Sequence, residues 1–284
     1  MTRPDDRPDD RVAELAAVNR YASSLSLHPK SFDAAAECAG EVLDRLDGDR
    51  PDLVVVFASE QHLDTLADVT TGLRRVLEPD VLIGCTAAGV AGSHREVETG
   101  PAISVFAANW GGGRARPLAL DSSPFPDVSR LPGVSGPAGG SEAEGLRITG
   151  WPDDLPASGT LLMLADPASF PLRDFLLLSN ESTPDLRVVG ALASGSRRVL
   201  ALDDTVSHRG AVAVLLDPSV PVDAVVSQGC RPIGRPFTIT RSERNIVHEL
   251  AGRPVAGRLR RRTGRGRAQH RARTRGSTGA RTSA

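Results

Sequence analysis

Residues 53–58, LVVVFA, form an unbroken apolar run of the kind found in a β-strand that is buried on both faces. The chain continues through a segment with leucines at helical spacing, about 63–77, and then enters a second apolar strand at 81–86. This strand leads into the glycine turn GCTAAG at 84–89, and a third predicted strand follows at 101–107. Strands and helices in this order are typical of an α/β fold whose helices cover a sheet.

The same order of elements occurs a second time. The run LLMLA at 161–165 leads through a predicted helix at about 169–178 to GALASG at 190–195, and then to GAVAVLL at 210–216. Both turns have the pattern G-x-x-A-x-G, and Gly190 stands 106 positions after Gly84. Similarity at one period suggests duplicated units. We therefore predict an α/β (α+β) layered sandwich with two pseudo-repeated halves, about 53–107 and 161–216, whose mixed β-sheets are covered by helices.

The other segments are assigned by the same criteria. Residues 31–46 predict a helix, capped at its start by Ser31. Residues 108–160 are rich in Gly, Pro and Ser, and predict a long connection with one short strand at 146–149. Further strands are predicted at 21–27, 187–192 and 222–228, with a hairpin formed by 237–240 and 246–250.

Composition restricts the class of protein. The chain has 284 residues, of which 40% are hydrophobic, and no apolar run reaches the roughly 18–20 residues that span a bilayer. The first eleven residues alternate Pro, Asp and Arg, which predicts a disordered acidic leader rather than a signal peptide. Three cysteines far apart favour neither a disulfide framework nor a structural zinc site. We therefore expect a cytoplasmic protein without a membrane partner.

The net charge of −1 hides two unlike segments. Residues 255–284 contain ten arginines and no acidic residue, so the preceding 254 residues carry a net charge of −11. Arginine also supplies 33 of the 34 basic residues, which indicates a GC-rich gene. Out-of-frame reading of such a gene produces Arg-, Gly- and Ala-rich sequence, and we interpret the disordered tail as a frameshift product. The alternative is a basic arm for nucleic acid, although the tail has no aromatic residue for base stacking.

The two glycine turns are the first candidates for function. Glycines after a strand allow backbone amides to face a ligand. Neither turn has the spacing of a dinucleotide-binding loop or a P-loop. Two interpretations stay open: close packing of the strand against a helix, or the lining of a pocket between the halves. The predicted ligand-binding residues are Gly84, Cys85, Thr86, Gly89, His94, Gly190, Ser194, Gly195, Gln228, Gly229, Cys230 and Arg231.

The case for catalysis is weak. Cys230 stands beside Arg231, which favours its thiolate, but spacing ties no histidine to it. The six histidines show no paired metal-ligand spacing, so no metal site and no catalytic residue are assigned. Asp166, at a strand-to-helix junction, is interpreted as a helix N-cap.

Seven segments together resemble the FIST family. They are VVVFAS at 54–59, LIGCTAAGV at 82–90, GPAISVFAA at 100–108, MLADPASF at 163–170, RVVGALAS at 187–194, RGAVAVLL at 209–216 and SQGCRPIGRPFTIT at 227–240. The resemblance is to the family's N-terminal module and covers about residues 20–254, so residues 12–254 are taken as that module. After residue 254 this chain departs from the family, whose members continue into a C-terminal FIST module.

The resemblance implies a sensory module of a signal transduction protein that binds a small ligand, with amino acids proposed, and acts on a downstream signalling protein. No cofactor is expected, although some family members are linked to haem-based gas sensing, which keeps haem as an alternative. A hydrolase or transferase that uses Cys85 or Cys230 is the enzymatic alternative.

Overall fold

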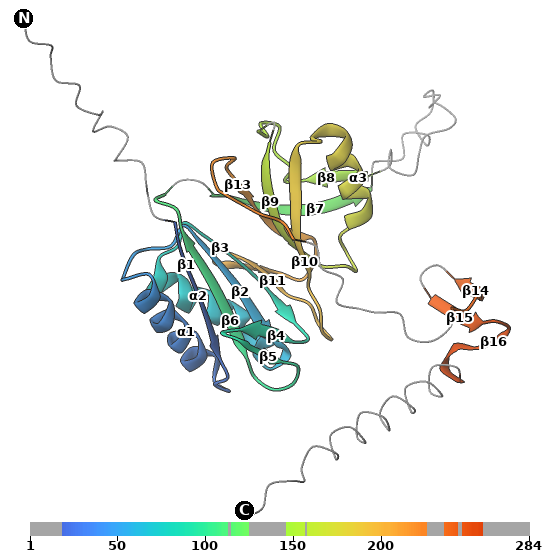
Figure 1. Ribbon diagram of the computed structural model, residues 1–284, viewed down its shortest axis with the longest axis horizontal. Coiled ribbons are helices and arrows are strands. Elements are labelled where there is room, and N and C mark those ends of the chain that lie inside the picture. Colours follow the sequence, from blue (N-terminus) through green and yellow to red (C-terminus); the bar gives the residue numbers. More distant parts are fainter. Residues whose placement is uncertain are drawn as a thin grey trace, which may run out of the picture. The chain divides into compact units, whose positions relative to one another are not determined.

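The computed structural model describes residues 19–112, 115–124, 146–156, 158–225, 236–243 and 246–257 (Figure 1). It divides the chain into two compact units, Met1–Ala224 and Val225–Ala284. The first unit contains both predicted halves. No helix in the described part of the chain is long and apolar enough to cross a membrane.

The first sheet has six strands in the order β1-β6-β2-β3-β11-β12. They are β1 (Arg20–Ser26), β2 (Leu53–Ser59), β3 (Val81–Ala87), β6 (Ile103–Asn109), β11 (Leu200–Leu202) and β12 (Thr205–Ser207). The strands β2 and β3 run parallel, whereas β6 is antiparallel to its neighbours β1 and β2. The mixed sheet predicted from the apolar runs is therefore confirmed.

Two α-helices and one 3-10 helix belong to the first half. They are α1 (Ser31–Arg45), η2 (Glu60–Thr65) and α2 (Leu66–Leu77), and Figure 1 shows α1 and α2 against one side of the first sheet. The predicted cap of α1 is wrong, because Lys30 is the N-cap residue and Ser31 is the first helical residue. The Ser31 hydroxyl bonds instead to Nδ1 of His62, at 2.8 Å.

The second sheet has five strands in the order β10-β9-β13-β7-β8. They are β7 (Ala115–Pro124), β8 (Leu146–Thr149), β9 (Gly159–Ala165), β10 (Leu186–Leu192) and β13 (Ala211–Leu216). The strands β9 and β10 run parallel, and β13 is antiparallel to both β9 and β7. The helix of this half, α3 (Leu172–Ser182), begins later than predicted.

Three buried clusters separate four layers. One joins α1 and α2 to the first sheet, through residues such as Val42, Leu73 and Val56. The second lies between the two sheets and joins Val55 to Val214. A third cluster joins the outer face of the second sheet to Phe175 of α3. Because β2 meets helices on one face and a sheet on the other, all but one of its seven residues are buried, and the predicted layered sandwich is confirmed.

The two halves share one strand order. The core of the first sheet, β1-β6-β2-β3, corresponds to β7-β13-β9-β10 in the second. Each half also has a hairpin of three-residue strands between its last two long strands: β4 (Val90–Gly92) with β5 (Arg95–Val97), and β11 with β12. The predicted pseudo-repeat is thus present in the topology. The hairpins break the symmetry, since β11 pairs with β3 while β4 and β5 form a separate two-stranded sheet.

Some strand predictions are wrong. Strand β7 lies in the stretch predicted to be a connection, and pairing with β13 stabilises it despite its proline and arginine residues. Residues 222–225 are not a strand, and 226–228 lie outside the described residues. The predicted hairpin of the second unit is confirmed as β14 (Ile239–Glu243) with β15 (Ile246–Leu250), joined by β16 (Arg253–Pro254).

Candidate functional site

The two glycine turns meet where the chain crosses from one sheet to the other. Residues 193–199 leave β10 and lead into β11, which pairs with β3. On the way, Ser194 N donates to the Thr86 carbonyl at 3.3 Å, and Ala88 N donates to Ser194 Oγ at 3.0 Å. The Thr86 hydroxyl accepts from Val199 N at 3.0 Å. The structure therefore brings together Thr86 and Ser194, two predicted site residues that are 108 positions apart.

Gly84 and Gly190 serve close packing between neighbouring strands. A Cβ on Gly84 would lie 2.7 Å from the Val56 carbonyl oxygen of β2, and one on Gly190 would lie 1.8 Å from that of Met163 in β9. These two oxygens occupy equivalent places in the repeat. The packing interpretation thus accounts for both glycines, but the neighbour is a strand and not the helix that was predicted.

The other two glycines of the turns, Gly89 and Gly195, also lie against backbone or side chains. Gly195 has φ +107, and an added Cβ would lie 2.7 Å from Oε1 of Glu60 in η2. That oxygen also accepts a hydrogen bond from Ser196 N. Gly89 is exposed and lies beside the Val97 carbonyl oxygen, 3.2 Å from an added Cβ. Gly195 thus allows η2 of the first half to hold the crossover segment.

Cys85 lies between the two sheets and is only 2% exposed. Burial raises the pKa of its thiol to about 12, so almost no thiolate exists at neutral pH. Because the thiolate is the nucleophile, this position does not suit a cysteine-dependent hydrolase.

The remaining predicted residues are not in this cluster. His94 is exposed at the tip of the β4–β5 hairpin, where its φ is +65. Gln228, Gly229, Cys230 and Arg231 lie outside the described residues.

Three acidic residues at the carboxyl ends of β2 and β9 bind the crossover segment. Glu60 accepts a hydrogen bond from Ser196 N, and Asp64 of η2 pairs with Arg197 at 2.5 Å. Asp166, the first residue after β9, pairs with Arg198 Nε at 2.5 Å. These contacts hold the crossover segment against both halves. The sequence analysis did not identify the residues Ser-Arg-Arg at 196–198 that make them.

The Asp166 side chain is held by two hydrogen bonds and one ion pair. Its carboxylate accepts from Ser169 Oγ at 2.6 Å and from Ala168 N at 3.2 Å. Burial alone raises the pKa of Asp166, but these bonds and the Arg198 guanidinium outweigh it and hold the pKa below its usual value. The predicted helix cap is wrong, because Asp166 caps the turn before α3 and Pro171 occupies the N-cap position.

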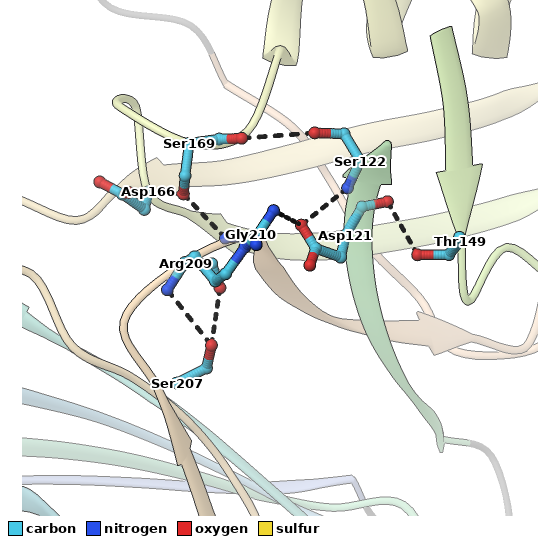
Figure 2. A network of polar contacts seen from close by, with 8 residues as sticks. All are labelled: Asp121, Ser122, Thr149, Asp166, Ser169, Ser207, Arg209 and Gly210. Atoms are coloured by element: carbon cyan, nitrogen blue, oxygen red, sulfur yellow. Dashed lines mark hydrogen bonds and ion pairs between the residues drawn. The ribbon is translucent and has the colours of Figure 1, made fainter. Parts of the chain in front are cut away.

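Figure 2 shows how this turn connects to the neighbouring strands. Gly210 N donates to Ser169 Oγ, and Asp166 N donates to the Gly210 carbonyl, each at 2.9 Å. Arg209 in turn pairs with Asp121 of β7 at 3.1 Å. The turn after β9 is thus fixed by β13 and β7 as well as by the crossover segment.

Beside this turn lies an open hollow of about 400 Å³. Its wall is formed by the segment between β9 and α3, the first turn of α3 and the last residue of β10: Pro167, Phe170, Pro171, Leu172, Arg173, Asp174 and Leu192. Since β9 and β10 run parallel, the hollow lies outside their carboxyl ends, where open α/β sheets commonly bind ligands. The sequence indicated this place only through DPASFP at 166–171, directly after an apolar strand.

A second hollow of about 250 Å³ lies between β8 and α3. It is lined by Arg147, Ile148, Trp151, Phe175, Leu178, Ser179 and Ser182. Neither hollow is lined by a histidine, cysteine, methionine or tyrosine that could ligate haem iron, so the residues of these hollows do not fit haem. Across the described residues, no group of three or more His, Cys, Asp or Glu side chains is placed to hold a metal ion.

Comparison with known proteins gives one family and several relatives. Residues 52–253 match the FIST family profile, described as the FIST N domain. An uncharacterized protein of Mycobacterium tuberculosis is 35% identical over 236 residues, which cover 82% of this chain and 56% of that protein, and an uncharacterized Mycobacterium bovis protein matches equally. Another from M. tuberculosis is 35% identical over 245 residues, with 85% and 59% covered. The chain thus spans a little over half the length of these relatives.

Proposed function

The chain belongs to the FIST N domain family, generally a sensory module of signal transduction, and on that premise we propose that it binds an amino acid or a related small molecule. The ligand lies in the hollow at the carboxyl ends of β9 and β10. The observation that carries this proposal is the hollow itself, which combines an apolar wall with one cationic and one anionic side chain.

The lining suits a zwitterion. The first turn of α3 contributes Arg173 and Asp174, and the amides at a helix start favour a carboxylate. Arg173 binds the same carboxylate, whereas Asp174 binds the ammonium group. Their side chains are now 3.7 Å apart, and that of Arg173 is 82% exposed, so it is free to turn toward a ligand. The side chain of Asp174 is less exposed and already borders the hollow. Phe170 and Leu192 then contact the ligand's apolar part.

The proposed binding site is also connected to the segment that joins the two halves. The turn that forms the wall is the same turn that Asp166 fixes to the crossover segment through Arg198. A ligand that orders the start of α3 therefore acts on the contact between the two halves. We propose that this contact transmits the signal to a downstream signalling protein.

A thermal unfolding screen of the full chain against the twenty amino acids tests the proposal. A ligand at about 100 times its Kd adds about 2.7 kcal/mol of stability, which raises the Tm by several degrees. Arg173→Ala weakens binding about tenfold or more, because it removes a charged partner of the carboxylate. The matched control is Arg75→Ala, an exposed arginine of α2, which leaves binding unchanged.

Two results would overturn the proposal: no amino acid shifts the Tm, or the two arginine variants bind alike. An absorption spectrum recorded after incubation with haem adds a separate arm. A Soret band that depends on protein would favour the haem alternative over the amino acid.

A further inference from the structure

In the part of the chain that the structure describes, strand β10 lies at one end of its sheet. Among the described residues it pairs with β9 on one side and with no strand on the other. Val188 and Val189 are half-buried, Gly190 and Ala191 are exposed, and Leu192 is 46% exposed. An apolar edge with free backbone groups is a template for pairing with another strand.

In the first half, the equivalent edge is paired with another strand. Its equivalent strand, β3, pairs on the corresponding side with β11, antiparallel. The paired residues of β3 are Ile83, Gly84 and Cys85, which correspond in the repeat to Val189, Gly190 and Ala191. The glycine of the repeat therefore does not prevent pairing at this edge. The β4–β5 hairpin, which corresponds to β11–β12, forms its own sheet and does not pair with β10.

We propose that the edge of β10 pairs with β10 of a second copy of this chain, antiparallel about a two-fold axis near Gly190. In this register Val189 lies opposite Ala191 of the second copy, and Val188 lies opposite its Leu192. An axis of this kind brings each surface against itself, so the strand must be compatible with its own sequence.

Strand β10 meets that condition. Residues 188–192 carry no charge, so no like charges face each other across the axis. The one charged residue of the strand, Arg187, stands at its start and donates to the Val222 carbonyl oxygen.

Light scattering after gel filtration, without ligand, tests the pairing on the full chain. We expect the mass to rise toward that of a dimer as protein concentration increases. Ala191→Lys puts a charge into the apolar pairing and raises the dimer Kd about tenfold or more. The matched control is Ala36→Lys on the exposed face of α1, with association unchanged.

Amide hydrogen exchange of the unaltered chain gives an independent reading that does not depend on the folding of a variant. Exchange of residues 189–191 slows at high protein concentration, while that of β3 stays constant. The proposal is wrong if the chain stays monomeric and exchange in β10 is independent of concentration. It is also wrong if the two lysine variants associate alike. Neither result bears on amino acid binding, which is measured separately.

Discussion

The strands β3 and β10 occupy the same place in the two halves, yet their surroundings differ. Both follow a parallel strand and a helix, and both contain the glycine that approaches the neighbouring backbone. Six of seven residues of β3 are buried, against one of seven in β10. The difference arises because β11 covers the outer edge of β3 and the second sheet covers its inner face. A repeated sequence thus sets the strand order, while burial depends on which element lies alongside.

The residues that end β2 and β9 show a second difference between the halves. In the first half, Ser59 N donates to the Ala102 carbonyl and Ser59 Oγ accepts from Ala102 N. In the second, Asp166 N makes the equivalent backbone bond to Gly210, but Ser169 Oγ accepts from Gly210 N. The carboxylate of Asp166 is therefore left to bind Arg198 of the crossover segment. The side chain of Ser59 in the first half thus has two counterparts in the second half. Ser169 makes the equivalent hydrogen bond, and Asp166 pairs with Arg198.

The largest expected effect comes from adding a methyl group at the two repeat glycines. Gly190→Ala lowers the free energy of unfolding by about 4 kcal/mol, because its φ of +154 is one that L residues rarely adopt and its added Cβ would lie 1.8 Å from the Met163 carbonyl oxygen. Gly84→Ala costs about 3 kcal/mol through crowding against Val56 alone, since Gly84 has no positive φ. Denaturant unfolding of both variants measures the two losses. Equal losses, or the reverse order, would show that the edge strand β10 shifts outward and relieves both the crowding and the backbone strain.

Next in size is the loss of the Asp166 carboxylate. Asp166→Asn lowers stability at pH 7 by about 2 kcal/mol, because it removes the partner of Arg198 and weakens the bond from Ser169. Ser59→Ala, the matched change in the first half, costs about 1 kcal/mol.

The pH dependence of this loss has a defined sign. The folded-state pKa of Asp166 is lowered, so its contribution is complete above the ordinary value of about 3.9 and is lost as the pH falls through the lowered pKa. The gap between the unaltered chain and Asp166→Asn is therefore constant from about pH 5 to 8 and narrows below about pH 4. Unfolding curves recorded across that range check it, and a gap that widens in acid contradicts the assignment.

The smallest expected effect concerns His62 of the first half, which is fully buried and has no partner at Nε2. Burial, followed by the nearby His28, lowers its pKa, so the neutral form is favoured in the folded state. Its contribution to the stability of the fold is complete above about pH 6.5 and is lost as the pH falls through the lowered pKa.

His62→Gln removes this mild-acid loss, whereas His94→Gln, at the exposed hairpin tip, leaves it in place. Unfolding between pH 7 and 5 compares the two variants. If both retain the same pH dependence, another group is responsible. Together with the Asp166 result, this experiment separates two acid responses: that of His62 starts near pH 6.5, and that of Asp166 starts below about pH 4.

Much of the fold was predictable because long apolar runs carry strong signals. The runs at 53–58, 81–86 and 161–165 all proved to be strands, and the repeat indicated the common order of elements. The hairpins at 90–97 and 200–207 were missed, since strands of three residues have too little periodicity to recognise. Strand β7 was missed because its pairing with β13, and not its own composition, stabilises it.

For the candidate site, the sequence determined which residue types stand at the ends of the repeated strands. It supplied the glycines that the close strand approach requires, and it included Thr86 and Ser194 among the predicted site residues. Only the tertiary structure decided that these two meet, that Asp166 pairs with an arginine 32 positions later, and that the hollow lies beside β10. The physical reason is that side-chain chemistry and periodicity are local properties, whereas contacts across the crossover depend on how the two sheets pack.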